Sequence, residues 1–308
     1  MRKTLFLLLS FIIPSFLHGQ EVEFTSFEKL DLPGESGYFH PLLSPSGQMM
    51  ALTSSNRQGL FVYNFDSGKL QTISDATGAG SEVVFAPDES KLYFTEDEYV
   101  QNRRRSSLMV FDFVSGHKGR IENQHQINEA ELNWWKKWQA FLRTESFLNL
   151  SPYIEALKEG HYNYPYVISK GNRIIYKDGV SDNPIQPFNS GNYLWASLSP
   201  DETKIVAVST GKGAFVCDSD GSNVKPLGDL ESPAWLNNDF IAGMVTEDDG
   251  HVITDASLRV INIHDKTVYE PADTSIEIMH PSVCRENNRI AAHTDDGEIV
   301  LFKYRVSD

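Results

Sequence analysis

Two histidines stand in the same local pattern near opposite ends of the sequence. His40-Pro41 and His280-Pro281 each lead into a short run of strand-forming residues. Imidazole accepts and donates protons near neutral pH and is also a common ligand of transition metals. Two imidazoles close to a carboxylate would therefore serve a divalent metal site or acid–base catalysis. Such a site requires a fold that brings the two ends of the chain together.

Other chemically useful residues occupy the equivalent position of further repeats. We align the repeats on the proline of each His-Pro pair and its counterpart in the other repeats. The position before it is then occupied by His40, Glu82, Tyr164, Trp195, Ser232 and His280, with Glu129 or Glu131 in the least regular repeat. Aromatic faces stack on sugar rings, so Tyr164 and Trp195 beside the histidines fit carbohydrate binding. The catalytic candidates are His40, His280 and Tyr164, and the binding candidates are Glu82, Trp195, Ser232 and Glu131. No cofactor is indicated with certainty, and a divalent metal between His40 and His280 is the one open possibility.

A structural explanation of the His-Pro pairs stays open. Imidazole at a strand entrance can cap a backbone carbonyl or a buried water without any further function. His293 belongs to a second strand and is left out of the site, and His117, His125, His161, His251 and His264 fall in or beside turns.

A strand pattern that recurs along the chain indicates how these residues are positioned. Apolar residues alternate with period two and end at a turn in four segments, 60–68, 108–116, 214–221 and 258–265. This alternation predicts half-buried strands that enter tight hairpins. Four strands in roughly forty residues, repeated, are typical of the blades of a β-propeller.

The turn sequences strengthen this interpretation. Segments 44–47 (Ser-Pro-Ser-Gly), 86–89 (Ala-Pro-Asp-Glu) and 199–202 (Ser-Pro-Asp-Glu) each precede an apolar strand. They resemble the repeats of the TolB-like (WD40-like, PD40) β-propeller family, and the resemblance covers most of residues 38–306. It implies an all-β fold, a single β-propeller in which the first strand of each blade lines a central channel. It implies no particular activity, because such propellers include scaffolds, receptors, peptidase lids and lyases.

The number of blades and the way the ring closes follow from the repeat spacing. First strands start near residues 41, 83, 131, 165, 196, 233 and 281, which favours seven blades. Residues 131–142 also fit a helix, so six blades with an insertion at about 122–163 are the alternative. The final strand, residues 298–304, has no successor. We expect the N-terminal strand, residues 27–32, to pair with the C-terminal blade, close the ring and bring His280 beside His40.

Composition limits the location and partners of the protein. Residues 1–19 have the basic start and short apolar run of a cleaved signal peptide, which leaves 20–308 as the propeller domain in the periplasm or outside the cell. No transmembrane segment is expected after cleavage. The net charge of −15 argues against a nucleic-acid partner. The exposed-looking Arg103–Arg105 run is expected at a hairpin tip, and Cys217 and Cys284 as buried apolar residues rather than a disulfide.

Two functions fit these observations. The first is an exported, non-catalytic propeller that binds a protein or a polysaccharide of the cell envelope through its channel mouth and loop face. The second is a polysaccharide lyase or glycoside hydrolase with a His/Glu/Tyr site at the channel. The absence of the GxSxG, HExxH, P-loop and GxGxxG motifs favours the first. The sequence does not indicate an oligomeric state.

Overall fold

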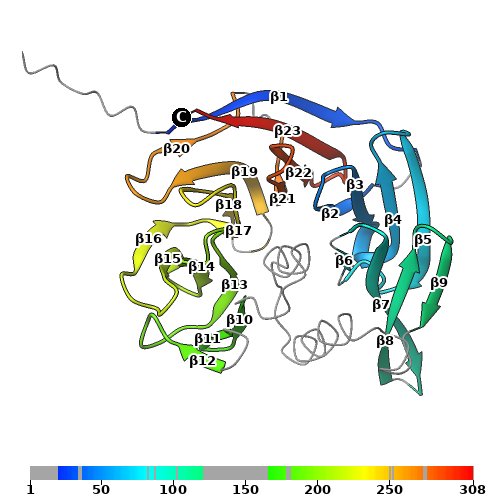
Figure 1. Ribbon diagram of the computed structural model, residues 1–308, viewed down its shortest axis with the longest axis horizontal. Coiled ribbons are helices and arrows are strands. Elements are labelled where there is room, and N and C mark those ends of the chain that lie inside the picture. The colour runs from blue at the N-terminus through cyan, green and yellow to red at the C-terminus, as the bar shows by residue number, and fades with distance from the viewer. Residues whose placement is uncertain are drawn as a thin grey trace, which may run out of the picture.

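The computed structural model describes residues 20–33, 37–81, 83–86, 88–101, 103–120, 166–177, 182–249, 251, 253–272 and 276–307. Within these ranges the chain forms 23 strands in six antiparallel sheets and one short 3-10 helix, η1 (Ser55–Arg57). Figure 1 shows the sheets arranged around a common centre, as the blades of a propeller are. The predicted all-β fold of the propeller class is therefore confirmed.

The strands follow one another from the centre outward in each of the first three sheets. The first sheet contains β2 (Phe39–Leu43), β3 (Met49–Thr53), β4 (Gln58–Asn64) and β5 (Lys69–Thr77). The second contains β6 (Val83–Phe85), β7 (Lys91–Val100), β8 (Arg103–Asp112) and β9 (His117–Arg120). The third contains β10 (Tyr166–Lys170), β11 (Arg173–Lys177) and β12 (Asp182–Ile185), so the first strand predicted to start near residue 165 is present.

The next two sheets repeat the same order. One contains β13 (Tyr193–Leu198), β14 (Lys204–Ser209), β15 (Gly213–Asp218) and β16 (Lys225–Gly228). The other contains β17 (Glu231–Trp235), β18 (Phe240–Asp248), β19 (Ile253–Asn262) and β20 (Val268–Tyr269). The segment on which the choice between seven and six blades depends, residues 121–165, lies outside the described residues, so the preference for seven stays a prediction.

The last sheet combines the two ends of the chain. It contains β21 (Met279–Cys284), β22 (Arg289–His293) and β23 (Ile299–Val306), with β1 (Val22–Leu30) on its outer edge. Strand β1 pairs antiparallel with β23 along its whole length, from Val22 opposite Val306 to Leu30 opposite Ile299. The predicted partner of the final strand is therefore present, and its pairing covers an edge that would otherwise be open.

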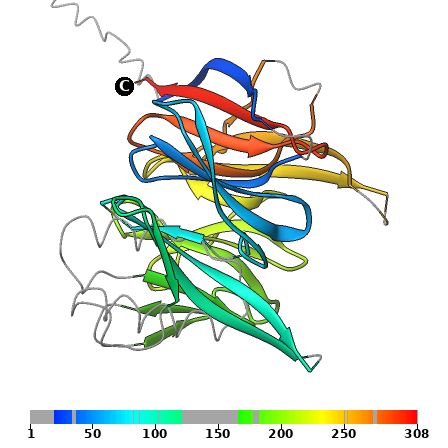
Figure 2. The ribbon, with the colours of Figure 1, turned by 90° about the vertical axis from the view of Figure 1, so that its right-hand side faces the viewer.

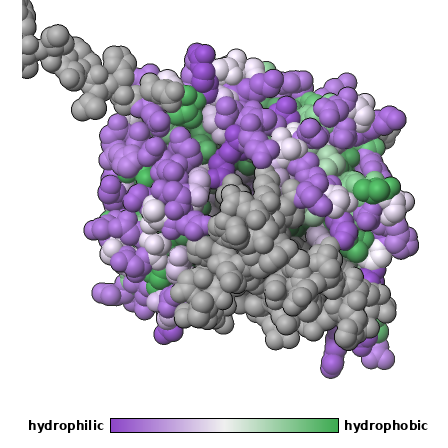
Figure 3. Space-filling model, in the orientation of Figure 1, coloured by the Kyte–Doolittle hydropathy of each residue, from purple (hydrophilic) through white to green (hydrophobic). Residues whose placement is uncertain are grey.

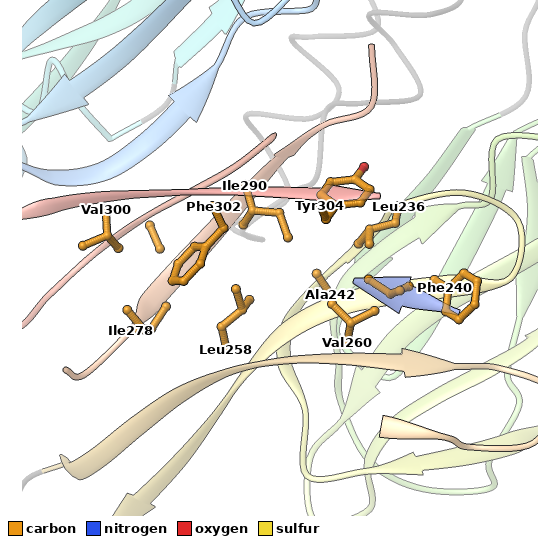
Figure 4. Packing of buried hydrophobic residues seen from close by; sticks show 12 residues of the cluster. Leu236, Phe240, Ala242, Leu258, Val260, Ile278, Ile290, Val300, Phe302 and Tyr304 are labelled. Carbon is orange, nitrogen blue, oxygen red and sulfur yellow. The ribbon is translucent and has the colours of Figure 1, made fainter. Parts of the chain in front are cut away.

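Apolar side chains pack between neighbouring sheets. Figure 4 shows one such cluster, in which Phe240 and Leu258 from the β17–β20 sheet face Ile290 and Phe302 from the last sheet. Another cluster joins the first sheet to the last through Leu43, Met50 and Ala291 with their neighbours. Because the strands alternate, one side chain in two enters such a layer, which is the pattern that the sequence carries. Cys217 and Cys284 are both buried thiols that form no disulfide, as expected.

Two hairpins are longer than the others. Figure 2 shows the β7–β8 and β18–β19 hairpins extending away from the body of the ring. Arg103–Arg105 lie at the exposed end of the β7–β8 hairpin, as expected, where they begin β8 and pair with Val100, Tyr99 and Glu98 of β7. Arg104 lies 2.9 Å from a carboxylate oxygen of Asp97, so cross-strand charge pairing extends the strands past the core.

Pairing of β1 with β23 predicts unequal effects of two phenylalanine substitutions. Phe302 is 1% exposed and contacts the rings of Phe24 and Phe27, whereas Phe27 is 44% exposed. We expect Phe302→Ala to lower the free energy of unfolding by about 3–5 kcal/mol, because it leaves a cavity in the core. Phe27→Ala should cost about 1 kcal/mol or less. Urea unfolding measures both, and equal losses would contradict this packing.

Candidate histidine site at the centre of the sheets

The inner strands of four sheets carry the same backbone irregularity at the same place. On each of these strands two residues oppose one residue of the next strand: His40-Pro41, Trp195-Ala196, Ser232-Pro233 and His280-Pro281. The first residue of each pair has a left-handed backbone, with φ of 50°, 50°, 47° and 49° respectively. A bulge of this kind normally has glycine there, and an L residue costs about 1–2 kcal/mol. The bulge redirects the side chain, so the positions aligned in the sequence are structurally equivalent in these four repeats.

Three histidine rings meet where the first and last sheets touch. The rings of His40 and His280 lie with centroids 4.6 Å apart. His293 of β22 lies 5.2 Å from His40 and 5.4 Å from His280. One ring nitrogen from each of the three lies within 4.8 Å of those of the other two. Residues from two ends of the chain therefore form one cluster of nitrogen donors.

The hydrogen bonds of His293 fix its orientation. Its side chain is 4% exposed, and its Nδ1 lies 2.9 Å from the carbonyl oxygen of Thr294. Because a carbonyl only accepts, Nδ1 carries the proton and donates it. The other nitrogen, Nε2, is buried and has no hydrogen-bond partner among the described residues. Its lone pair is thus left without a donor from that part of the chain.

Burial keeps all three rings neutral. The pKa of His40 is lowered to about 3, first by burial and then by the neighbouring His280, Arg57 and His293. The pKa of His280 is lowered to about 4, first by burial and then by His293 and Arg57. The pKa of His293 is also lowered by burial, and its bond to Thr294 opposes that shift. At pH 7 each ring therefore keeps one free lone pair.

The other predicted site residues fall into two groups. Ser232 places its Oγ 3.5 Å from Nδ1 of His280, and Trp195 is half-buried against the apolar layer that includes Trp235. The structure thus brings Ser232 to the histidines and places Trp195 on an equivalent bulge. Glu82, Tyr164 and Glu131 lie outside the described residues.

Sequence reasoning assigned His293 to a second strand and gave it no part in the site. The structure places it in the cluster because β21 and β22 pair antiparallel, with His293 directly opposite Met279, the residue before His280. Antiparallel pairing could have placed His293 in the site from the sequence. When the first two strands of a blade pair, the end of the second strand lies beside the start of the first.

Comparisons with known proteins bear on the fold. No protein-family model matches the sequence, and no curated protein matches it. A solved TolB-like protein from Agrobacterium tumefaciens is 14% identical with a TM-score of 0.53, covering 94% of this chain and 98% of its own. An oligogalacturonate lyase from Vibrio parahaemolyticus is 11% identical with a TM-score of 0.52, covering 92% of this chain and 98% of its own.

The propeller domain of Cps50 (Swd1) from Myceliophteria thermophila is 8% identical with a TM-score of 0.52, covering 92% of this chain and 99% of its own. At such identities a likeness shows the fold alone. The chain is therefore a β-propeller protein, and its function has to be argued from its own residues.

At a bulge residue with a positive φ, glycine should give a more stable protein than alanine, which is the reverse of the order in a regular strand. We expect Ser232→Gly to be more stable than Ser232→Ala by about 0.5–1 kcal/mol, because glycine adopts a positive φ without steric cost. Ser282, on β21, provides the matched control because it has no positive φ, so glycine there should be the less stable of the two. Guanidinium unfolding gives the four values. Glycine less stable than alanine at Ser232 would contradict the bulge.

Proposed function

We propose that the protein is an exported, non-catalytic β-propeller that binds a carbohydrate of the cell envelope through the inner strands of its blades. The observation that carries the proposal is the repeated bulge at His40, Trp195, Ser232 and His280. Strained backbone at equivalent positions of several repeats has a stability cost, and such strain is concentrated at functional sites. The equivalent bulges carry an aromatic ring, a hydroxyl and two imidazoles, and sugar binding sites combine aromatic faces with a few polar groups.

The surface supports a carbohydrate over a protein partner. On the face seen in Figure 3 the described residues are mainly hydrophilic, with apolar residues scattered among them. Among the described residues, the exposed large apolar side chains belong to several different strands and turns: Phe27, Tyr99, Val100, Val114, Ile253 and Val268. Protein docking sites are more often marked by a contiguous apolar patch. A protein partner is therefore an outcome of the test below.

Export and a closed ring are parts of the same proposal. The signal peptide at residues 1–19 lies outside the described residues, and it is supported by its basic start and short apolar run. Within the described residues, no helix has the length and hydropathy of a membrane span. We infer that pairing of β1 with β23 closes the ring, since β2 also lies against β21 and β22.

The enzyme alternative, a polysaccharide lyase or glycoside hydrolase, is supported by the neutral histidines at the centre. A general base works best when its pKa is near the working pH. The pKa of His40 is about 3 and that of His280 about 4, so both are weak bases at pH 7. Because both pKa values lie well below the working pH, the histidines favour a binding role over a catalytic one.

Glycan binding should depend on Trp195 and not on an aromatic residue elsewhere. We expect Trp195→Ala to weaken binding to any glycan found on an array about tenfold, through loss of the stacking contact. Tyr99→Ala, at the β7–β8 hairpin and 67% exposed, is the control and should bind as wild type does. Isothermal titration gives the dissociation constants.

Three results would overturn this assignment. Equal losses of glycan affinity in Trp195→Ala and Tyr99→Ala would show that the inner strands are not the binding site. An array on which no glycan binds, together with site-specific crosslinking of one envelope protein at position 195, would assign a protein partner. Turnover of a glycan that His280→Gln abolishes, without loss of thermal stability, would make the protein an enzyme.

A further inference from the structure

We propose that His40, His280 and His293 bind one divalent first-row transition-metal ion, such as Zn²⁺, through one ring nitrogen each. The metal would be held between the first and last sheets of the propeller. This metal site is a separate proposal from carbohydrate binding. It can be tested with the metal ion alone and without any glycan.

The distances fit a metal site that closes slightly around its ion. The donor nitrogens of the three rings all lie within 4.8 Å of one another. Zinc–nitrogen bonds of about 2.0–2.1 Å at tetrahedral angles place nitrogens about 3.4 Å apart. Rotation of the His40 and His280 side chains, both half-buried, supplies the remaining movement. His293, which is buried, would be the fixed member of the three.

The unpartnered nitrogen of His293 is the second, independent observation. Within the part of the chain that the structure describes, Nε2 is buried without a hydrogen-bond partner, whereas Nδ1 donates to the Thr294 carbonyl. A buried polar atom without a partner costs about 1–3 kcal/mol, and native proteins rarely leave one without a role. Metal-binding histidines characteristically donate their other N–H to a backbone carbonyl or carboxylate, which fixes the tautomer. His293 has this arrangement already.

The donor set indicates the class of metal. Three imidazoles suit Zn²⁺, Ni²⁺, Cu²⁺ or Co²⁺, whereas Ca²⁺ and Mg²⁺ require oxygen ligands. Three protein ligands also leave a fourth position for water or for an added ligand. At His280, the neighbouring Ser232 hydroxyl can accept a hydrogen bond from Nδ1 when Nε2 faces the metal, although at 3.5 Å that bond is weak until the site closes.

Metal binding by the purified protein tests this site directly. After treatment with a chelator and its removal, wild type should bind one Zn²⁺ per chain by isothermal titration and by elemental analysis. Co²⁺ should give the visible absorption bands of a four-coordinate ion. His40→Gln, His280→Gln and His293→Gln should each weaken Zn²⁺ binding by about a hundredfold or more. His264→Gln is the matched control, because His264 is exposed and bonds to Asp239 instead.

His293→Gln alters a buried residue, so its folding has to be measured separately. Circular dichroism and the thermal midpoint without metal establish which variants are folded, and His40→Gln and His280→Gln keep the test valid if His293→Gln is not. Zn²⁺ should raise the midpoint of wild type and of His264→Gln, but not that of the three site variants. Wild type without stoichiometric binding, or binding that survives in folded His40→Gln and His280→Gln, would overturn the proposal. Neither result would contradict the proposed glycan binding, because the glycan array is measured without added metal.

Discussion

Nine residues near the start of the described chain, Val22–Leu30, hydrogen-bond along the last strand, and the site depends on this pairing. It places the C-terminal repeat in a four-stranded sheet with both faces packed, and holds that sheet against the first one. Leu43 of β2 donates its backbone N–H to Ser282 of β21 across that contact. His40 and His280 face each other only because two sheets from opposite ends of the chain meet here.

The contact between these sheets is polar as well as apolar. The carbonyl oxygen of Gly47 accepts hydrogen bonds from Asn287 and Arg289, so the first turn of the first sheet is tied to the last sheet. Gly47 has a φ of 71°, and a Cβ there would lie 2.0 Å from the Asn287 amide nitrogen. Glycine therefore fits closely at a position where the sequence showed only a turn. A rigid joint on one side of the histidines limits how far their rings can separate.

The four bulges show how one position of the repeat presents a different side chain in each sheet. A residue with φ near 50° directs its side chain differently from its strand neighbours, and proline follows it in three of the four cases. Proline lacks an N–H, so it fits where the ladder is already interrupted. The His-Pro, Ser-Pro and Trp-Ala pairs thus share one backbone geometry with different chemistry at its tip. A propeller can vary its ligand in this way without changing its fold.

The sequence by itself determined the all-β propeller class, the strand pattern, and the equivalence of His40, Trp195, Ser232 and His280, because alternation and turn residues are local signals. It also determined that the N-terminal strand would pair with the last one, since an unpaired final strand was visible in the repeat count. Only the tertiary structure decided that His293 joins the cluster and that its Nε2 has no partner among the described residues. These features depend on strand pairing across the sheet and on distances between sheets, which residue spacing along the chain does not specify.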